Sequence, residues 1–282
     1  MLGFAIVLFI IVLNLIAHEM AHAVAMSNYG IEIDKAGIGV PIPGLTFKWK
    51  PKFLKFPLTI SPLILFAYVK ATEAGNEKLK KLPYKDRAVI YSSGALTNAF
   101  ISLLLLPISL IFVIKLDLPF NFVIIFTAIS CIILALFFIV GLSSRYVRYL
   151  VCSRIAPIVG IVIFILLLYV MVPPFAQNFH YAITHAGASE GGGSSLAGPA
   201  QILKIATHLK NTTSAFILGF MISNGMALMN LLPIYPLDGG QTTLAFLERY
   251  DKKVTIWLKT IQILLFLMLI FLVIGSEILA FK

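Results

Sequence analysis

Charged residues are scarce in this chain. Of its 282 residues only 12% are Asp, Glu, Lys or Arg, whereas a soluble domain usually carries about 25%. Hydrophobic residues make up 60% of the chain and gather in long blocks. Several blocks reach the roughly 20 residues that a membrane-spanning helix needs. The sequence therefore excludes a soluble globular protein and predicts an integral membrane protein.

Acidic residues are scarcer than basic ones, 12 against 22, which gives a net charge of +10. A basic balance can indicate a nucleic-acid partner, but here Lys and Arg lie in short connections that flank apolar blocks. Such placement is typical of loops on the cytoplasmic side of a membrane. The expected partner is thus the lipid bilayer, with no nucleic acid.

Cysteines, internal repeats and polar domains are also missing or rare. Two cysteines, Cys131 and Cys152, are too few for a disulfide framework. The first apolar block lacks a basic leader and a small-residue cleavage site, so we interpret it as a retained helix. With neither a repeat nor an extramembrane domain, residues 1–282 form one predicted membrane domain.

Six apolar blocks define the expected fold, an all-α polytopic membrane protein with a small β segment after its first helix. The predicted core spans are residues 2–26, 88–114 and 215–232, and the additional spans are 118–142, 155–172 and 254–279. The basic connections after the first, third and fifth spans belong on the cytoplasmic side. Both chain ends then lie outside in a multi-pass protein, expected in the cell membrane.

The β segment is predicted at residues 31–50. Polarity alternates in 31–34 and again in 45–50, and Pro41, Pro43 and Gly44 lie between. This pattern favours two strands and a turn. We expect the segment to offer a strand edge to an unwound substrate.

The clearest chemical signal is His18-Glu19-Met20-Ala21-His22. Two imidazoles four residues apart share one face of a helix and can hold one metal ion. In this H-E-x-x-H pattern the Glu is the general base. Zinc lowers the pKa of a bound water to about 7, and Glu19 would take that proton. Three ionisable groups in an apolar helix mark a functional site.

A catalytic zinc takes three protein ligands and keeps an open position. Asp238 is the best third ligand, because it follows the fifth predicted span at the end where the charge pattern also places His18 and His22. Gly239 and Gly240 are expected to permit a tight bend there.

Together these motifs resemble the site-2 protease family of intramembrane metalloproteases. That family pairs H-E-x-x-H with N-x-x-P-x-x-x-L-D-G, found here as Asn230, Pro233, Leu237, Asp238 and Gly239. The resemblance implies that His18, His22 and Asp238 bind one Zn²⁺ per chain and that Glu19 is catalytic. It also implies that Asn230 holds the substrate backbone or the developing oxyanion.

Two weaker elements extend the resemblance. Gly94 and Asn98 match a family G-x-x-x-N element, which adds both to the expected substrate-binding residues. The alternative for them is helix packing and an interhelical hydrogen bond. Gly198-Pro199 matches a family Gly-Pro element before the last core helix.

The chain also departs from the family pattern. Ala95 and Tyr235 stand where many members have proline, and spans 118–142 and 155–172 stand where several members have a PDZ domain. The ligands are untouched by these differences, but PDZ-based substrate selection is not carried over.

The expected function is hydrolysis of peptide bonds in transmembrane protein substrates by a zinc-activated water, with the site towards the cytoplasmic side. The alternatives are a membrane metal-ion transporter, a non-catalytic relative that binds membrane proteins, and a protease of prenylated proteins. A transporter is disfavoured because the sequence has a single ligand set and no repeat. A non-catalytic binder would not need Glu19, and a protease of prenylated proteins should have a Glu ligand where this chain has Asp-Gly-Gly. The sequence makes no prediction of oligomeric state.

Overall fold

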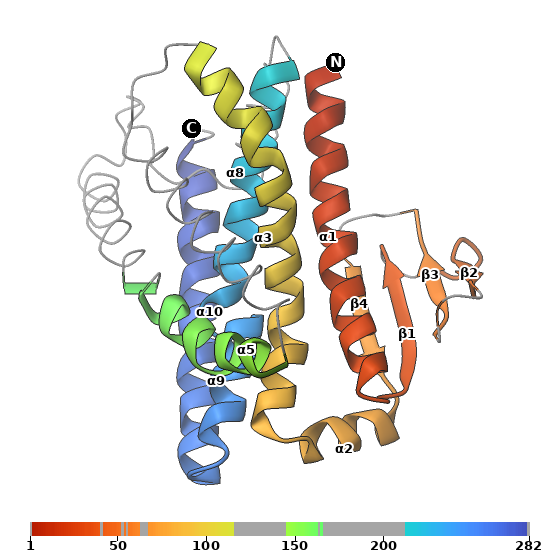
Figure 1. The fold of residues 1–282 in the computed structure, drawn as a ribbon, viewed down its shortest axis with the longest axis vertical. Coiled ribbons are helices and arrows are strands. Elements are labelled where there is room, and N and C mark those ends of the chain that lie inside the picture. The colour runs from red at the N-terminus through yellow and green to blue at the C-terminus, as the bar shows by residue number, and fades with distance from the viewer. Residues whose placement is uncertain are drawn as a thin grey trace.

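Long helices lying side by side form the frame of the protein. The computed structural model describes residues 2–39, 42–51, 54, 56–62, 67–115, 145–162, 164–165 and 212–280. In Figure 1 the two chain ends lie at the same end of the bundle, as expected from the alternating spans. The long helices are α1 (Leu2–Asn28), α3 (Tyr84–Lys115), α8 (Thr212–Leu231) and α10 (Lys252–Ala280).

Three helices within the described part of the chain are long and apolar enough to cross a membrane. They are Leu2–Asn28, Tyr84–Leu105 and Lys253–Phe271, and a shorter apolar stretch runs over Ala215–Leu231 in α8. The predicted span 118–142 lies outside the described residues, as do residues 163 and 166–172 of the predicted span 155–172. Six spans therefore stay a prediction.

Short helices connect the long ones. They are α2 (Glu73–Lys81), α5 (Arg145–Leu150), the π-helical turn η1 (Val151–Ile155) and α9 (Asp238–Leu247). The Thr72 hydroxyl caps α2 by accepting a hydrogen bond from the Gly75 amide, and α3 follows directly. Helices α1, α3 and α8 pack on one another, and α9 packs on α3.

The β segment is larger than expected. Strands β1 (Ile33–Ile38), β2 (Phe47–Trp49), β3 (Leu58–Ile60) and β4 (Ala67–Ala71) form one sheet in the order β2-β3-β1-β4. The two strands and the turn predicted within residues 31–50 are present as β1, β2 and the turn between them. The two strands do not pair, because β3 lies between them, parallel to β1 and antiparallel to β2. Short apolar runs beyond residue 50 supply β3 and β4, and their pairing is not visible in local alternation.

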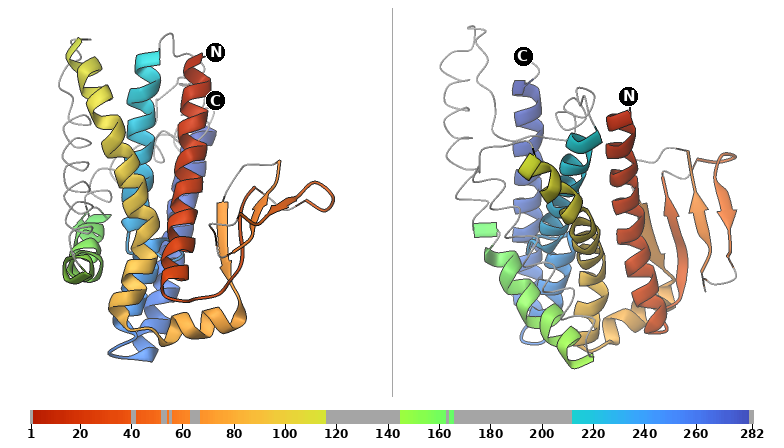
Figure 2. Two further views of the ribbon diagram at one scale, coloured as in Figure 1. Left: turned by 45° about the vertical axis from the view of Figure 1, so that its right-hand side comes forward. Right: turned by 45° about the horizontal axis from the view of Figure 1, so that its top comes forward.

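One face of the sheet packs on α1 (Figures 1, 2). Ala23 of α1, Ala36 of β1 and Phe56 form a buried cluster, with Met20 and Val69 against it. Strand β4 is at one edge of the sheet, and this packing holds it beside the second half of α1.

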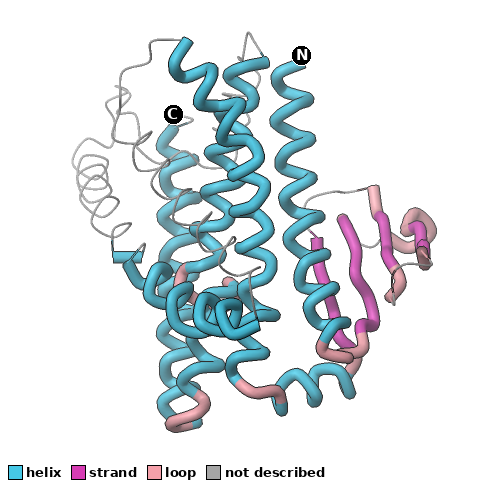
Figure 3. Tube along the Cα trace, in the orientation of Figure 1, coloured by secondary structure: helices cyan, strands magenta, loops and turns pink. Residues whose placement is uncertain are grey.

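A tight turn sends the chain from α1 into the sheet (Figure 3). The Ile31 amide donates to the Met26 carbonyl and the Gly30 amide donates to the Ser27 carbonyl, which is the Schellman pattern of helix ends. Gly30 has φ = 67°, a conformation that costs other residues about 1–2 kcal/mol. Ile31 is buried against Met26, so the turn fixes where β1 begins.

We predict that Gly30→Ala destabilises the protein by about 1–2 kcal/mol because an added Cβ disfavours the left-handed backbone. The control is Gly225→Ala in α8, where a Cβ meets open space and helix propensity should be neutral or better. Detergent-induced unfolding followed by circular dichroism measures both. Equal stabilities of the two variants would contradict this account of the turn.

Candidate metal centre

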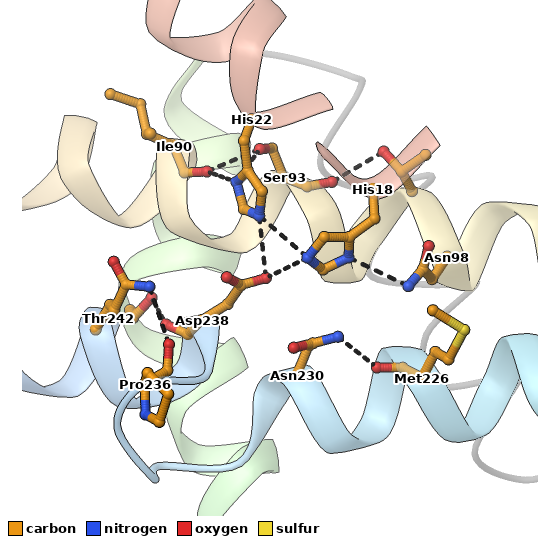
Figure 4. A network of polar contacts seen from close by, with 12 residues as sticks. His18, His22, Ile90, Ser93, Asn98, Met226, Asn230, Pro236, Asp238 and Thr242 are labelled. Atoms are coloured by element: carbon orange, nitrogen blue, oxygen red, sulfur yellow. Dashed lines mark hydrogen bonds and ion pairs between the residues drawn. The ribbon is translucent and has the colours of Figure 1, made fainter. Parts of the chain in front are cut away.

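Two imidazoles from α1 and a carboxylate from α9 meet inside the helix bundle (Figure 4). The Nε2 atoms of His18 and His22 lie 3.2 Å apart. Each lies 3.3 Å from Oδ2 of Asp238, and all three residues are buried. The structure thus brings Asp238 to two histidines that precede it by more than two hundred positions in the sequence.

The spacing of these atoms fits one small cation. Tetrahedral ligands at the usual Zn–N and Zn–O lengths of about 2.0–2.1 Å stand about 3.3 Å from one another. The three observed separations, 3.2, 3.3 and 3.3 Å, match such a triangular face. As a direct charge-assisted hydrogen bond each His–Asp238 contact is long, since those usually measure about 2.7–2.9 Å. The donor set therefore fits zinc with a fourth position left over.

The backbone of α3 orients His22. Its Nδ1 lies 2.8 Å from the Ile90 carbonyl oxygen and 3.1 Å from the Ser93 hydroxyl. A ring that donates through Nδ1 presents the lone pair of Nε2 to Asp238, and two lone pairs facing each other in a buried site need a cation between them.

Asn98 and Gly94 both lie against the imidazoles. Asn98 is fully buried, its Nδ2 lies 3.2 Å from Nδ1 of His18, and its Oδ1 has no hydrogen-bond partner. Half a turn of the amide would let Oδ1 accept from His18 Nδ1–H, the arrangement that metal-bound histidines use. A Cβ on Gly94 would lie 2.4 Å from His22 Nε2. Gly94 and Asn98 are thus neighbours of the candidate ligands His18 and His22. Their role in substrate binding stays a prediction.

The chain bends before α9 to place Asp238 at the first position of that helix. The expectation that Gly239 and Gly240 make the bend was wrong, because neither has a positive φ. Both are helical, and an added Cβ would meet backbone atoms at 2.1 Å from Gly239 and 2.3 Å from Gly240. They allow α9 to pack closely on the segment before it.

Glu19 faces a cavity of about 420 Å³ beside the three ligands. Its carboxylate also meets the Val69 backbone amide of β4. Asn230 lines the same cavity, and its Nδ2 donates to the Met226 carbonyl. The lining further includes Met26, Lys70, Ala71, Asn76, Leu79, Tyr91, Pro236, Leu237 and Gln241. A carboxylate, a candidate metal site and a polar cavity are thus adjacent. The Gly198-Pro199 element lies outside the described residues.

Several supporting residues were missed by the sequence analysis. Arg87, buried at the start of α3, donates to Glu248 at 2.5 Å and to the Ala245 carbonyl, which ties α3 to the end of α9. Gln262 of α10 accepts from the Tyr235 amide just before Asp238. Buried polar residues at a span's end or within a span are a usable signal, but their partners are set by tertiary packing.

Comparison with known proteins agrees with this geometry. No curated protein and no solved structure matched the chain. The model of peptidase family M50 matches residues 3–275, nearly the whole chain. Members of this family are membrane-embedded zinc metalloproteases. The family match and the long apolar helices together indicate an integral membrane protein. Because the match covers nearly the whole chain, the chain belongs to peptidase family M50, the site-2 protease family.

Proposed function

We propose that the protein is an intramembrane zinc endopeptidase that hydrolyses peptide bonds of transmembrane protein substrates. The observation that carries the proposal is the triangle of His18, His22 and Asp238 with Glu19 on the same cavity. Family membership supports a metallopeptidase. A transporter or a mere binder has no need of a carboxylate base beside the ligands.

In this proposal some residues of the site bind the metal ion or the substrate, and Glu19 transfers the proton. Zinc held by His18, His22 and Asp238 would supply Lewis acidity and lower the pKa of water at the site to about 7. Glu19 takes a proton from that water and later gives it to the leaving amine. Asn230 lines the cavity, and its role in this proposal is to donate to the substrate backbone or to the carbonyl oxygen as charge develops.

A substrate helix must unwind, because its peptide groups are already hydrogen-bonded. Exposed backbone groups cost several kcal/mol each in lipid, and pairing with a strand edge can satisfy them. The prediction placed that edge within residues 31–50. We now propose β4 instead, since it ends the sheet and its Val69, Lys70 and Ala71 line the cavity.

The side of the membrane is proposed from charge. The site lies near the end of the bundle that carries α2 and the turn after α9 (Figure 1), where Lys78, Lys80 and Lys81 are found. Basic connections favour the cytoplasmic side. We propose a multi-pass protein of the cell membrane with its site towards the cytoplasm.

Metal content and cleavage test the mechanism. We predict one zinc per purified chain and cleavage of a model transmembrane substrate that chelation abolishes. Glu19→Gln should keep the zinc and lose about 10²–10⁴-fold in rate, because general base catalysis is removed. Asp238→Ala should lose both zinc and rate. Glu77→Gln, an exposed surface carboxylate on α2, is the matched control. Cleavage that survives Glu19→Gln or chelation sinks the proposal.

A second prediction concerns Asn98. Removing a hydrogen bond to a metal-bound histidine typically costs about 10–100-fold in metal affinity. Asn98→Ala should weaken zinc binding by that factor in a competitive chelator titration. Thr97→Ala, whose hydroxyl donates to the Ser93 carbonyl and not to an imidazole, should leave it unchanged. Equal affinities for the two variants would remove Asn98 from the support of His18.

Strand pairing predicts a periodicity in the substrate. Successive side chains and amides of a strand face alternate sides. Single backbone N-methyl groups along a model substrate should therefore raise KM at every second residue beside the scissile bond. Zinc content serves as the control. An effect without alternation would rule out pairing along β4.

A further inference from the structure

A second cavity lies on another face of α1. It has a volume of about 660 Å³, within the range of small-molecule sites of roughly 300–1,000 Å³. Helices α1, α3 and α5 with η1 form its walls. The lining residues are Ala21, Val24, Ala25, Asn28, Tyr29, Val89, Ser93, Leu96, Thr97, Arg145, Arg148, Tyr149 and Cys152. None of these described lining residues is acidic.

The cavity has one apolar end and one basic end. Along α3 it runs from Val89 to Thr97, eight residues or about 12 Å of helix. Leu96 and Thr97 lie at the end that is farther along α3. At the other end, near the close of α1, stand Tyr29 and the two arginines of α5, Arg145 and Arg148. A ligand that fits must be charged at one end and apolar at the other.

The basic end is anchored to the bundle. Arg145 Nε donates to the Tyr149 hydroxyl at 2.9 Å, and that hydroxyl donates to Asp86 at 2.5 Å. Asp86 is the acidic group in this network, and it is engaged through Tyr149. A guanidinium has five N–H donors in a fork that matches phosphate geometry, so Arg145 can hold Tyr149 and a phosphate together.

We propose that this cavity binds an anionic phospholipid, with its phosphate at Arg145 and Arg148 and an acyl chain towards Leu96. Basic pockets between membrane helices bind anionic head groups. The α3 wall includes Ser93, whose hydroxyl lies 3.1 Å from His22 Nδ1. The lipid would therefore pass one hydrogen bond away from the candidate metal centre.

The test adds lipids to the purified full chain in neutral detergent and follows thermal unfolding. Phosphatidylglycerol should raise the unfolding temperature and saturate, whereas phosphatidylcholine and inorganic phosphate should not. In the double variant Arg145→Gln/Arg148→Gln the half-saturating concentration should rise about tenfold or more, because charge-assisted contacts are lost. The matched control, Lys80→Gln/Lys81→Gln, removes two exposed charges of α2 and should respond as wild type.

A second variant keeps the arginines and fills the apolar end. Val24→Trp should abolish the response to phosphatidylglycerol, whereas Leu13→Trp, a partly exposed position of α1 outside the cavity, should keep it. Mass spectrometry of intact protein should show copurified anionic lipid in wild type and in both controls, and none in Val24→Trp or the double arginine variant. An equal response in all variants, or an equal effect of inorganic phosphate or phosphatidylcholine, overturns the proposal.

Discussion

The structure depends on the cost of bringing a carboxylate and two imidazole lone pairs together where water is excluded. A buried carboxylate is expensive unless it is paired or bound to a metal. Here Asp238 Oδ2 has no hydrogen-bond donor of its own and faces two Nε2 atoms at 3.3 Å. A divalent cation would turn this unfavourable contact into a stable centre, so binding of the ion would be coupled to the folding that brings α1 and α9 together.

The rest of the fold places these three groups. Ile90, Ser93 and Asn98 of α3 contact the rings of α1, and Gly94 leaves room for them. Arg87 holds α9 from its far end, which fixes the helix whose first residue is Asp238. The turn at Gly30 leads the chain from α1 into the sheet. The sheet brings its edge strand β4 to Glu19. The cavity is thus bounded by Glu19 with the three candidate ligands on one side and by the edge strand β4 on another.

Much of this could be predicted from sequence because the signals are local or costly. Apolar runs gave α1, α3, α8 and α10, and the spacing of His18 and His22 needs only the helix period. Family membership was predicted from the same motifs and is confirmed. The sheet order was not predictable, because β3 and β4 are short and pair across the sequence. Gly239 and Gly240 were predicted to form a bend, but they instead allow close packing on a neighbouring backbone segment. Such packing cannot be predicted from the local sequence.

The central claim is that two imidazoles and one carboxylate bind zinc, and X-ray absorption of the zinc-loaded protein tests it most directly. The account predicts nitrogen and oxygen neighbours at about 2.0–2.1 Å with the multiple scattering of two imidazoles, and loss of this signal in Asp238→Ala. A sulfur neighbour at about 2.3 Å, or an unchanged spectrum in Asp238→Ala, would contradict it.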